Sequence, residues 1–257
     1  MSLRKNWDSG NTTLGVWLSI PSSVSAEAAA RSGVDYVCVD MQHGAIDYSS
    51  LVGMVQAIEL GGGVPIARVP WNEPGIIGKT LDAGSHGVVV PMVNTREQAE
   101  AVVHSTRYAP AGSRSWGPVM PSMRHADNRT WAHEHIACIP MIETVEAISN
   151  LDDILSVPGI DAIYVGPADL SISLGLEPGN RDGDPLFDDA LAAIVAGCHR
   201  HGVVPGIHST GALTPKRLEQ GFRMVTVTAD LLAMTIGVAS ELAAARGTTS
   251  GSSDRMY

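Results

Sequence analysis

Hydrophobic and polar positions along the chain follow two alternating patterns. Short runs rich in β-branched and apolar residues are typical of buried strands. Eight such runs occur, at residues 15–20, 35–40, 64–69, 87–92, 138–143, 161–166, 203–208 and 224–229. The longer segments between them carry apolar residues at helical spacing, as residues 48–63 do with Leu51, Met54, Val55 and Ile58. These segments predict helices at residues 23–33, 48–63, 73–84, 95–108, 144–159, 187–202, 214–221 and 231–247.

Eight strands alternating with eight helices predict a single α/β domain, a (β/α)8 or TIM barrel. The alternative is an open doubly wound sheet, which usually carries a GxGxxG motif after its first strand. Here the first strand is followed by "PSSVS" at residues 21–25, so the closed barrel is favoured. The predicted organisation is an N-terminal leader at 1–13, the barrel at 14–246 and a loose tail at 247–257.

Two stretches interrupt the alternation of strands and helices. Residues 109–137 form a long excursion after the fourth helix, and residues 173–186 are rich in Gly, Pro and Asp after the sixth strand. Long loops in compact domains are often functional, so both are candidates for shaping a binding site.

Composition narrows the class of protein. Of 257 residues, 44% are hydrophobic but only 5% aromatic, which suits a parallel sheet buried on both faces. The net charge of −10 and the lack of a basic stripe argue against nucleic-acid binding. Cys38, Cys138 and Cys198 lack CxxC spacing and are expected to be buried, reduced thiols. Without a signal peptide or a long apolar run, we expect a soluble cytoplasmic protein with no membrane contact.

Polar residues gather at the predicted ends of the strands, where a barrel of this type carries its chemistry. The segment "DMQHG" at residues 40–44, for example, directly follows the apolar run "VDYVCV". The fold would bring these strand ends together around one mouth, which we predict to be the active site. The polar residues concerned are Trp17, Asp40, Gln42, His43, Arg68, Glu143, Asp169 and His208.

Two carboxylates are candidate metal ligands. Taken singly, Glu143 and Asp169 could each be a helix cap or a turn residue. Together they stand at the ends of adjacent strands and face the same mouth. Two carboxylates with open positions suit a hard octahedral cation, Mg²⁺ or Mn²⁺, whereas Zn²⁺ would require imidazole or thiolate ligands.

Two cationic residues have both structural and functional interpretations. Arg68 lies in an otherwise apolar strand, so it is expected to pair with Asp40 or Glu143, to clamp a substrate carboxylate, or both. His43 is either a general base oriented by Asp40 or a loop histidine held by hydrogen bonds. The nearby carboxylates favour the base.

The positions of the lysines exclude one mechanism. The chain has three, Lys5, Lys79 and Lys216, and none stands at the end of a predicted strand. Schiff-base catalysis needs a lysine in the site, so carbonyl chemistry here would need a metal.

Several motifs give the chain a family resemblance. They include "GVWLSIPSS", "DYVCVDMQHG", "PIARVPWNEP", "RYAPAGSRS" and "GIDAIYVGPADLS", which occur in order within residues 14–240. With these the chain resembles the metal-dependent, pyruvate-specific class II aldolases of the 4-hydroxy-2-oxoheptanedioate aldolase and 2-dehydro-3-deoxyglucarate aldolase family. The resemblance implies a barrel of the phosphoenolpyruvate/pyruvate-binding type.

The resemblance also implies roles for individual residues. Glu143 and Asp169 would bind Mg²⁺ or Mn²⁺, with Co²⁺ a further candidate, and pyruvate would chelate that ion. Arg68 would stabilise the enolate and the aldehyde oxygen, and His43, paired with Asp40, would handle protons. The remaining implied contacts are Trp17 as a pocket wall and the backbone around Gly166, Pro167 and Ala168 as the carboxylate site.

The implied reaction is the reversible cleavage of a 4-hydroxy-2-oxo acid to pyruvate and an aldehyde through a metal-bound enolate. Decarboxylation of oxaloacetate would pass through the same enolate. The implied partners are a small 2-oxo acid, an aldehyde and further copies of the chain. Family members are often hexamers, trimers of dimers with the last helix exchanged. The stretch 231–247 fits either such an exchange or an ordinary eighth barrel helix.

Two alternatives stay open at this point. One is a lyase or synthase of the same superfamily acting on oxaloacetate or a coenzyme A thioester. Its phosphates would need a basic patch, and only Arg107, Arg114 and Arg124 form a weak cluster. The other is a non-catalytic barrel, against which the joint presence of the strand-end residues argues.

The sequence departs from the family pattern near the metal ligands. Met141 stands where the family often has a glutamine, two residues before Glu143. His208 and the 109–137 excursion also differ, and both are candidates for shaping the pocket of the second substrate.

Overall fold

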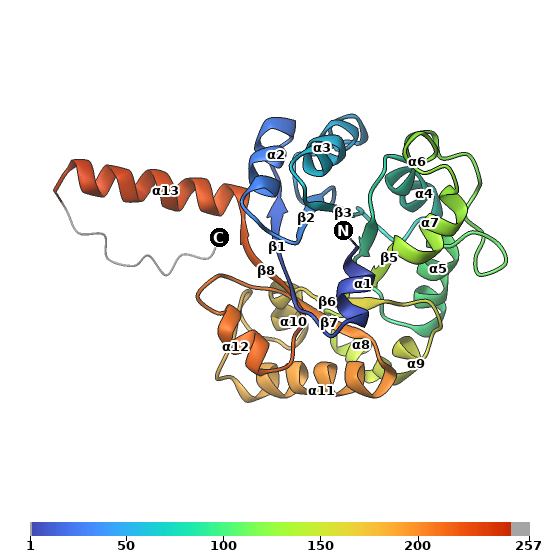
Figure 1. Ribbon diagram of the computed structural model, residues 1–257. Coiled ribbons are helices and arrows are strands. Elements are labelled where there is room, and N and C mark those ends of the chain that lie inside the picture. The colour runs from blue at the N-terminus through green and yellow to red at the C-terminus, as the bar shows by residue number, and fades with distance from the viewer. Residues whose placement is uncertain (1, 248–257) are drawn as a thin grey trace.

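The computed structural model describes residues 2–247, and its centre is a barrel of eight parallel strands (Figure 1). The hydrogen-bonded order around the barrel is β5-β4-β3-β2-β1-β8-β7-β6. The (β/α)8 fold predicted from the sequence is therefore confirmed. The strands are β1 (Thr13–Leu18), β2 (Tyr36–Asp40), β3 (Val64–Arg68), β4 (Gly87–Val90), β5 (Ala137–Pro140), β6 (Ala162–Val165), β7 (Val204–His208) and β8 (Met224–Ala229).

The barrel is nearly closed between β5 and β6. An isolated parallel bridge joins Met141 to Tyr164, and the Ile142 amide donates to the Tyr164 carbonyl at 2.9 Å. At the start of the same two strands the Asp161 amide donates to the Cys138 carbonyl at 3.1 Å. The open doubly wound sheet is thereby excluded.

Helices surround most of the barrel. Several begin at side-chain caps, such as Asp47 on the Ser50 amide and Thr95, which forms a capping box with Gln98. The helices are α1 (Leu3–Asp8), α2 (Ser23–Arg31), α3 (Tyr48–Leu60), α4 (Pro74–Asp82), α5 (Arg96–Thr106), α6 (Val119–Arg124), α7 (Asn128–His135), α8 (Val145–Ser149), α9 (Leu151–Leu155), α10 (Pro167–Ser173), α11 (Pro185–His201), α12 (Thr214–Glu219) and α13 (Asp230–Ala245).

The first residues of the chain cover the N-terminal ends of the strands. Leu3 and Trp7 of α1 are buried, and they pack with inward-facing residues at the strand starts, such as Val64 and Ala137. The Trp7 indole also donates to Thr13 Oγ1 at 3.0 Å. The segment placed in a leader by sequence thus contains a helix that contributes to the core. The tail placed at 247–257 lies outside the described residues except for Gly247.

The 109–137 excursion packs near the same N-terminal end of the barrel. Arg124 pairs with Glu59 at the end of α3, and Arg114 pairs with Asp82 at the end of α4 at 2.7 Å. The Trp131 ring meets the edge of His86, the residue before β4. Within one chain the excursion therefore lies away from the C-terminal strand ends and does not line their mouth.

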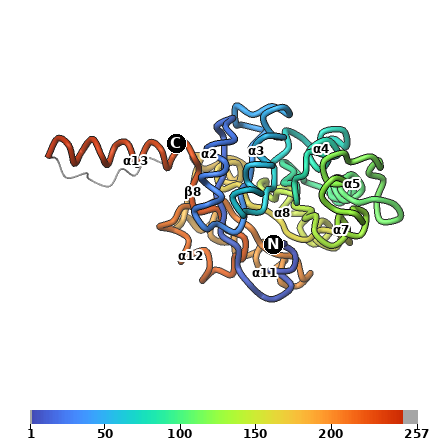
Figure 2. The backbone as a smooth tube through the Cα atoms, turned by 45° about the horizontal axis from the view of Figure 1, so that its top comes forward, coloured from blue at the N-terminus to red at the C-terminus, as the bar shows by residue number. Residues whose placement is uncertain are grey.

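The last described helix leaves the body of the protein. In Figures 1 and 2, α13 extends outward from the end of β8 instead of folding back along the barrel. None of its residues is buried, although Met234, Ile236 and Val238 are apolar. The outer side of β8 consequently keeps a partly exposed Val227 where an eighth helix would normally pack.

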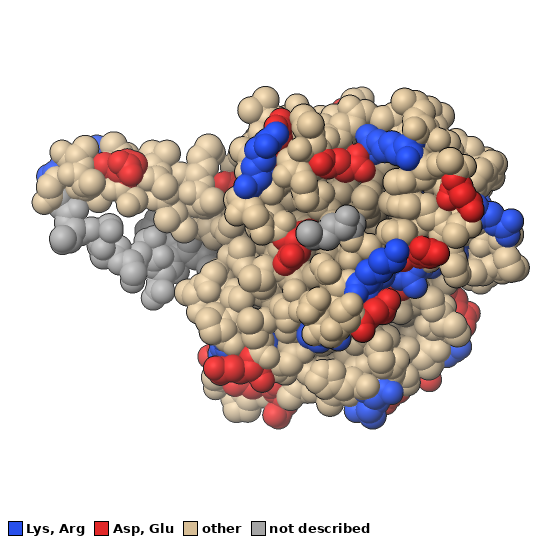
Figure 3. All heavy atoms as spheres, viewed as in Figure 1, with Lys and Arg blue, Asp and Glu red and all other residues tan. Residues whose placement is uncertain are grey.

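Charged side chains and cysteines occupy different parts of the molecule. On the face seen in Figure 3, basic and acidic side chains are interspersed and form no single basic patch. All three cysteines are buried and unpaired, as predicted. Within residues 2–247, no helix has the length and apolar character needed to cross a membrane.

Candidate active site

The centre of the barrel mouth is an ion pair between two strand ends. Asp40 and Arg68 are register partners at the last positions of β2 and β3. Arg68 donates through Nε to Asp40 Oδ1 at 2.8 Å and through Nη2 to Oδ2 at 2.6 Å. This bidentate geometry selects Asp40, of the two partners predicted for Arg68, and fixes the plane of the guanidinium.

The pair is held in a site that water hardly reaches. The side chains of Arg68 and Asp40 are only 11% and 3% exposed. Burial by itself would raise the pKa of Asp40, but the hydrogen bonds and charge of Arg68 outweigh it and hold that pKa below its usual range. Asp40 is therefore a carboxylate at neutral pH, and Arg68 keeps its charge at the barrel mouth.

The loop after β2 is folded onto the same carboxylate. Asp40 Oδ1 accepts from the amides of Gln42 at 3.0 Å and His43 at 3.3 Å. Asp40 thus contacts His43 through its backbone amide, while the His43 side chain is exposed at the mouth. Asp40 sets the conformation of the loop that carries His43.

An aromatic wall closes another side of the mouth. Trp17, buried on β1, stacks on Tyr164 of β6 with ring centroids 5.1 Å apart, and the Arg68 guanidinium lies 5.2 Å from the Trp17 ring. His208, at the end of β7, meets Trp17 edge-on at 5.5 Å. The Tyr164 hydroxyl bonds Thr226 at 2.5 Å, which fixes the ring that supports Trp17.

The buried surroundings of His208 keep its imidazole neutral. Burial, and then the charge of Arg68, lower the pKa of His208 from 6.5 to about 4. The unfolded chain therefore binds the proton first as the pH falls. The contribution of His208 to stability is complete above pH 6.5 and is lost progressively towards pH 4.

Replacing His208 by Gln should make the protein less sensitive to acid. Between pH 6.5 and 4 the wild type should lose up to about 3 kcal/mol of unfolding free energy that the variant does not lose. Urea unfolding at a series of pH values measures this difference. His199→Gln, at an exposed position on α11, is the control and should follow the wild type. Parallel wild-type and His208→Gln profiles would contradict the prediction.

Glu143 reaches the mouth from the segment after β5. It is 2% exposed, and its Oε1 accepts from the Met92 amide at 2.9 Å. Its other oxygen, Oε2, is buried and has no hydrogen-bond partner among the described residues. A Cβ built at Gly166 would overlap this Oε2, so only glycine lets the carboxylate approach the start of α10. A buried acceptor without a partner is costly, which points to a ligand that the protein itself does not supply.

Asp169 belongs to the same corner of the mouth. It stands in the first turn of α10 and is exposed. Burial first, and then the nearby charge of Asp169, raise the pKa of Glu143 to about 7. Two carboxylates that repel each other beside an unpartnered oxygen fit a divalent cation, which would relieve both costs.

Glu143 and Asp169 could supply only part of a coordination sphere. Across residues 2–247, no three or more His, Cys, Asp or Glu residues are grouped so as to hold a metal. This excludes a closed zinc-type site in that part of the chain and suits Mg²⁺ or Mn²⁺, which keep waters or take substrate oxygens. Met141, in place of the family glutamine, is buried, and its Cε would lie 3.1 Å from a Cβ at Gly166. It adds apolar packing and no polar ligand.

Two contributors to the site were not anticipated from the sequence. Met92 follows β4 with φ of 56°, in the left-handed region that residues with a Cβ seldom adopt. In this conformation its backbone amide donates a hydrogen bond to Glu143 Oε1. Tyr164 backs Trp17 from the barrel interior. Nothing in "GVVVPM" signals a positive φ, and Tyr164 sits in an ordinary apolar run. Only inward alternation along β6 could have suggested that Tyr164 faces the barrel interior.

The chain matches known proteins along most of its length. A family model described as HpcH/HpaI aldolase/citrate lyase matches residues 13–235. A hydroxypyruvate/pyruvate aldolase of Rhizorhabdus wittichii is 39% identical over 246 residues, which cover 95% of this chain and 98% of the relative. A 4-hydroxy-2-oxo-heptane-1,7-dioate aldolase of Klebsiella pneumoniae is 35% identical over 247 residues, covering 93% and 91%.

A solved structure gives the same picture of the fold. The crystal structure of an HpcH/HpaI aldolase/citrate lyase family protein from Burkholderia cenocepacia superposes with a TM-score of 0.88 at 30% identity. The match covers 95% of this chain and 98% of that one. The similarity therefore extends over the whole barrel and is not confined to the mouth.

Proposed function

Because the chain belongs to the HpcH/HpaI aldolase/citrate lyase family, we propose that its barrel mouth cleaves a 4-hydroxy-2-oxo acid to pyruvate and an aldehyde. The family resemblance predicted from the motifs is confirmed, and the chain is a pyruvate-dependent aldolase, a carbon–carbon lyase. The observation that carries the proposal is the unpartnered Glu143 Oε2, buried beside the first turn of α10 and close to the Asp40–Arg68 pair.

Glu143 and Asp169 would hold the divalent cation, Mg²⁺ or Mn²⁺, with Co²⁺ a further candidate. When bound, the cation supplies a Lewis acid that polarises the 2-keto group of the substrate. The backbone at Gly166, Pro167 and Ala168 would receive the substrate carboxylate. The glycine in this segment supports the assignment of the metal corner, because it lets Glu143 Oε2 lie against the start of α10, where Asp169 stands.

Arg68 and His43 would carry the charge and proton steps. His43, exposed at the mouth, takes the proton of the 4-hydroxyl group. The C3–C4 bond then breaks, the aldehyde forms, and the electron pair passes into the enolate of pyruvate. Arg68, fixed by Asp40, stabilises the enolate oxygen without having to reorganise. Protonation of C3 completes pyruvate, and the proton taken from the hydroxyl group balances this step.

Trp17 and His208 would form the wall that meets the second substrate. Trp17 offers an indole ring stacked on Tyr164, and His208 offers a neutral imidazole. Both suit the aldehyde portion of the substrate, since neither adds charge at the mouth. The 109–137 excursion packs at the opposite end of its own barrel and takes no part in this wall.

Metal dependence tests the proposed function. Purified protein should release pyruvate from a 4-hydroxy-2-oxo acid and from oxaloacetate, since both reactions pass through the same enolate. A chelator should remove the release almost completely, and added Mn²⁺ or Mg²⁺ should restore it. Pyruvate is followed by coupling to lactate dehydrogenase, with uncatalysed oxaloacetate decay in the same metal as the control. Release that persists unchanged in chelator would contradict the proposed site.

A coenzyme A substrate finds no support in the basic residues considered for it. Arg107 pairs with Asp161, and Arg114 pairs with Asp82. Arg124 pairs with Glu59. The three arginines thus serve separate ion pairs and do not form a phosphate-binding patch.

The three unpaired cysteines support a reducing, cytoplasmic location for the enzyme.

We also propose that copies of the chain exchange α13 within a homo-oligomer, such as a hexamer built from dimers. The support is a helix with no buried residue and exposed apolar side chains, facing away from a barrel that lacks its eighth helix. A helix that is apolar around much of its circumference is normally buried. Docking α13 of one copy on the open side of β8 of another would cover both surfaces.

Charged substitutions on α13 should break this assembly. In Val238→Asp/Leu242→Asp, two exposed apolar residues become anions that cannot be buried at an interface. We expect the oligomer to dissociate to monomers at micromolar concentration, as measured by light scattering after gel filtration. Glu241→Gln, on the same helix, is the control and should keep the wild-type mass. A monomeric wild type would contradict the exchange.

A further inference from the structure

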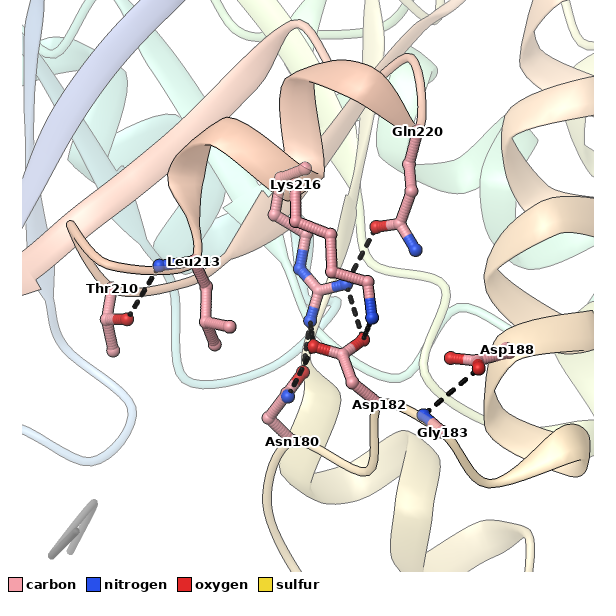
Figure 4. Close-up of polar contacts among 9 residues, drawn as sticks. Asn180, Asp182, Gly183, Asp188, Thr210, Leu213, Lys216 and Gln220 are labelled. Atoms are coloured by element: carbon pink, nitrogen blue, oxygen red, sulfur yellow. Dashed lines mark hydrogen bonds and ion pairs between the residues drawn. The ribbon is translucent and has the colours of Figure 1, made fainter.

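Arg217 of α12 is a fully buried cation outside the mouth. It is 0% exposed, and its guanidinium grips Asp182 through Nη1–Oδ1 at 2.9 Å and Nη2–Oδ2 at 3.0 Å. The same side chain also bonds Gln220 Oε1 at 2.7 Å and the side-chain oxygen of Asn180. Figure 4 shows Asn180, Asp182, Lys216 and Gln220 converging on this point.

Two of the partners of Arg217, Asn180 and Asp182, lie on the loop that follows α10, residues 174–184. Asn180 and Asp182 sit near its middle, and Lys216 adds a more exposed contact to Asp182 at 3.1 Å. The guanidinium therefore joins the segment after β7 to the segment after β6. These are the two neighbouring connections on the C-terminal side of the barrel.

Stability alone does not account for this buried cation. Removing charges from water costs several kcal/mol per ion, and buried ion pairs often contribute no more than apolar residues of similar volume. Arg217 Nε, moreover, has no hydrogen-bond partner among the described residues. What the network does supply is geometry, because a bidentate clamp tolerates little displacement of the loop.

The clamped loop is bonded directly to the helix at the mouth. The Gly179 amide donates to Ser171 Oγ at 3.1 Å, and Ser171 Oγ donates to the Ala168 carbonyl at 2.8 Å. The Leu176 amide donates to the Ser171 carbonyl at 2.9 Å. Ser171 is fully buried, and Ala168 directly precedes Asp169. A continuous set of contacts thus runs from Arg217 through the loop to the first turn of α10.

We propose that Arg217 is a positioning residue of the aldolase site, which holds loop 174–184 and, through Ser171, the first turn of α10 in the conformation that binds the cation and the oxo acid. The inference rests on the proposed function, because it assigns Asp169 and the backbone of residues 166–168 to those ligands. Arg217 itself touches neither. Its role is to keep the binding-competent conformation populated.

Loosening the clamp should weaken binding more than chemistry. If the competent conformation falls from nearly full occupancy to about a tenth, the apparent dissociation constants rise about tenfold. Arg217→Lys keeps the charge but loses the bidentate grip. We expect the Kd for Mn²⁺ and the KM for oxaloacetate to rise about tenfold, with kcat changed much less at saturating metal and substrate.

A second variant tests the link without removing a charge. Ser171→Ala deletes the hydroxyl that joins Gly179 to Ala168 and is nearly isosteric. We expect it to raise the Kd for Mn²⁺, as Arg217→Lys does. Hydrogen exchange should also become faster in residues 174–184 of both variants, a readout that does not depend on activity.

The matched control is a buried arginine at the other end of the barrel. Arg107 is 6% exposed and pairs with Asp161 at 2.5 Å, next to the N-terminal ends of β5 and β6. Arg107→Lys should lose stability to a degree similar to Arg217→Lys but keep the wild-type Kd for Mn²⁺. Free Mn²⁺, measured by electron paramagnetic resonance, gives the Kd for each variant.

The outcomes separate this inference from the proposed function. Unchanged Mn²⁺ affinity and KM in both Arg217→Lys and Ser171→Ala would overturn the positioning role, even if stability falls. An equal loss of Mn²⁺ affinity in Arg107→Lys would overturn it too, because the effect would then be general destabilisation. A wild-type protein that binds no Mn²⁺ would instead refute the metal site, and the inference with it.

Discussion

Glu143→Gln is expected to lower metal-dependent pyruvate release by about 10³-fold or more, because it removes one of the two carboxylates proposed as ligands of the Lewis-acid cation. Mn²⁺ binding should weaken in parallel. Pyruvate release and Mn²⁺ titration measure the two effects. Glu146→Gln, an exposed carboxylate in the following helix, is the matched control and should behave as the wild type.

The same substitution should not destabilise the metal-free protein. Burial, and then the charge of Asp169, raise the pKa of Glu143 to about 7, above its ordinary value of 4.5. The unfolded chain therefore loses this proton first, and Glu143 reduces stability progressively as the pH rises from 4.5 to 7. Gln carries no charge and can still accept from the Met92 amide. We expect Glu143→Gln to unfold at higher urea than the wild type at pH 8, with little difference at pH 4.5.

This combination of lost activity and gained stability is specific to a ligand site. Replacing a residue that served only the fold would lower both the activity and the stability of the protein. If Glu143→Gln released pyruvate at the wild-type rate, Glu143 would not be a ligand. If it unfolded at lower urea than the wild type at pH 8, the carboxylate would have a partner in the fold that the hydrogen bonds do not account for.

Arg68→Met should produce the largest loss of stability together with a loss of activity. It leaves the Asp40 carboxylate buried without its cation, which costs about 3–5 kcal/mol. It also removes the positive charge that we propose stabilises the developing enolate, an effect worth about 10²–10³ in kcat. Urea unfolding and pyruvate release from the same preparation measure the two effects.

The double variant Arg68→Met/Asp40→Asn separates the two roles of the pair. Removing both charges should recover much of the stability, since Asn can still accept from the amides of Gln42 and His43. Activity should stay at the level of Arg68→Met. Arg96→Met, whose partner Glu100 is exposed, is the control and should change the unfolding free energy by less than about 1 kcal/mol. Recovered activity in the double variant would show that Arg68 acts only through Asp40.

The sequence by itself determined the barrel and the location of its mouth. Strand and helix periodicities depend on neighbours a few residues apart, so the eight repeats could be counted from local pattern. Parallel strands in a barrel end at the same face, and this rule alone predicts that Asp40, Arg68, Glu143 and Asp169 lie together. The sequence also limited the partner of Arg68 to two carboxylates, and the β2–β3 register decided between them.

Tertiary structure decided the features that depend on contacts between distant segments. The apolar residues of 231–247 predicted a helix correctly. Periodicity indicates that one face of a helix is buried, but it does not tell whether the chain's own barrel or another copy of the chain covers that face. The departure of α13 from its own barrel was therefore open. For the same reason the sequence did not show that α1 closes the N-terminal end, or that Met92 turns its amide to Glu143. It also left unassigned the grip of Arg217 on a loop 35 residues earlier.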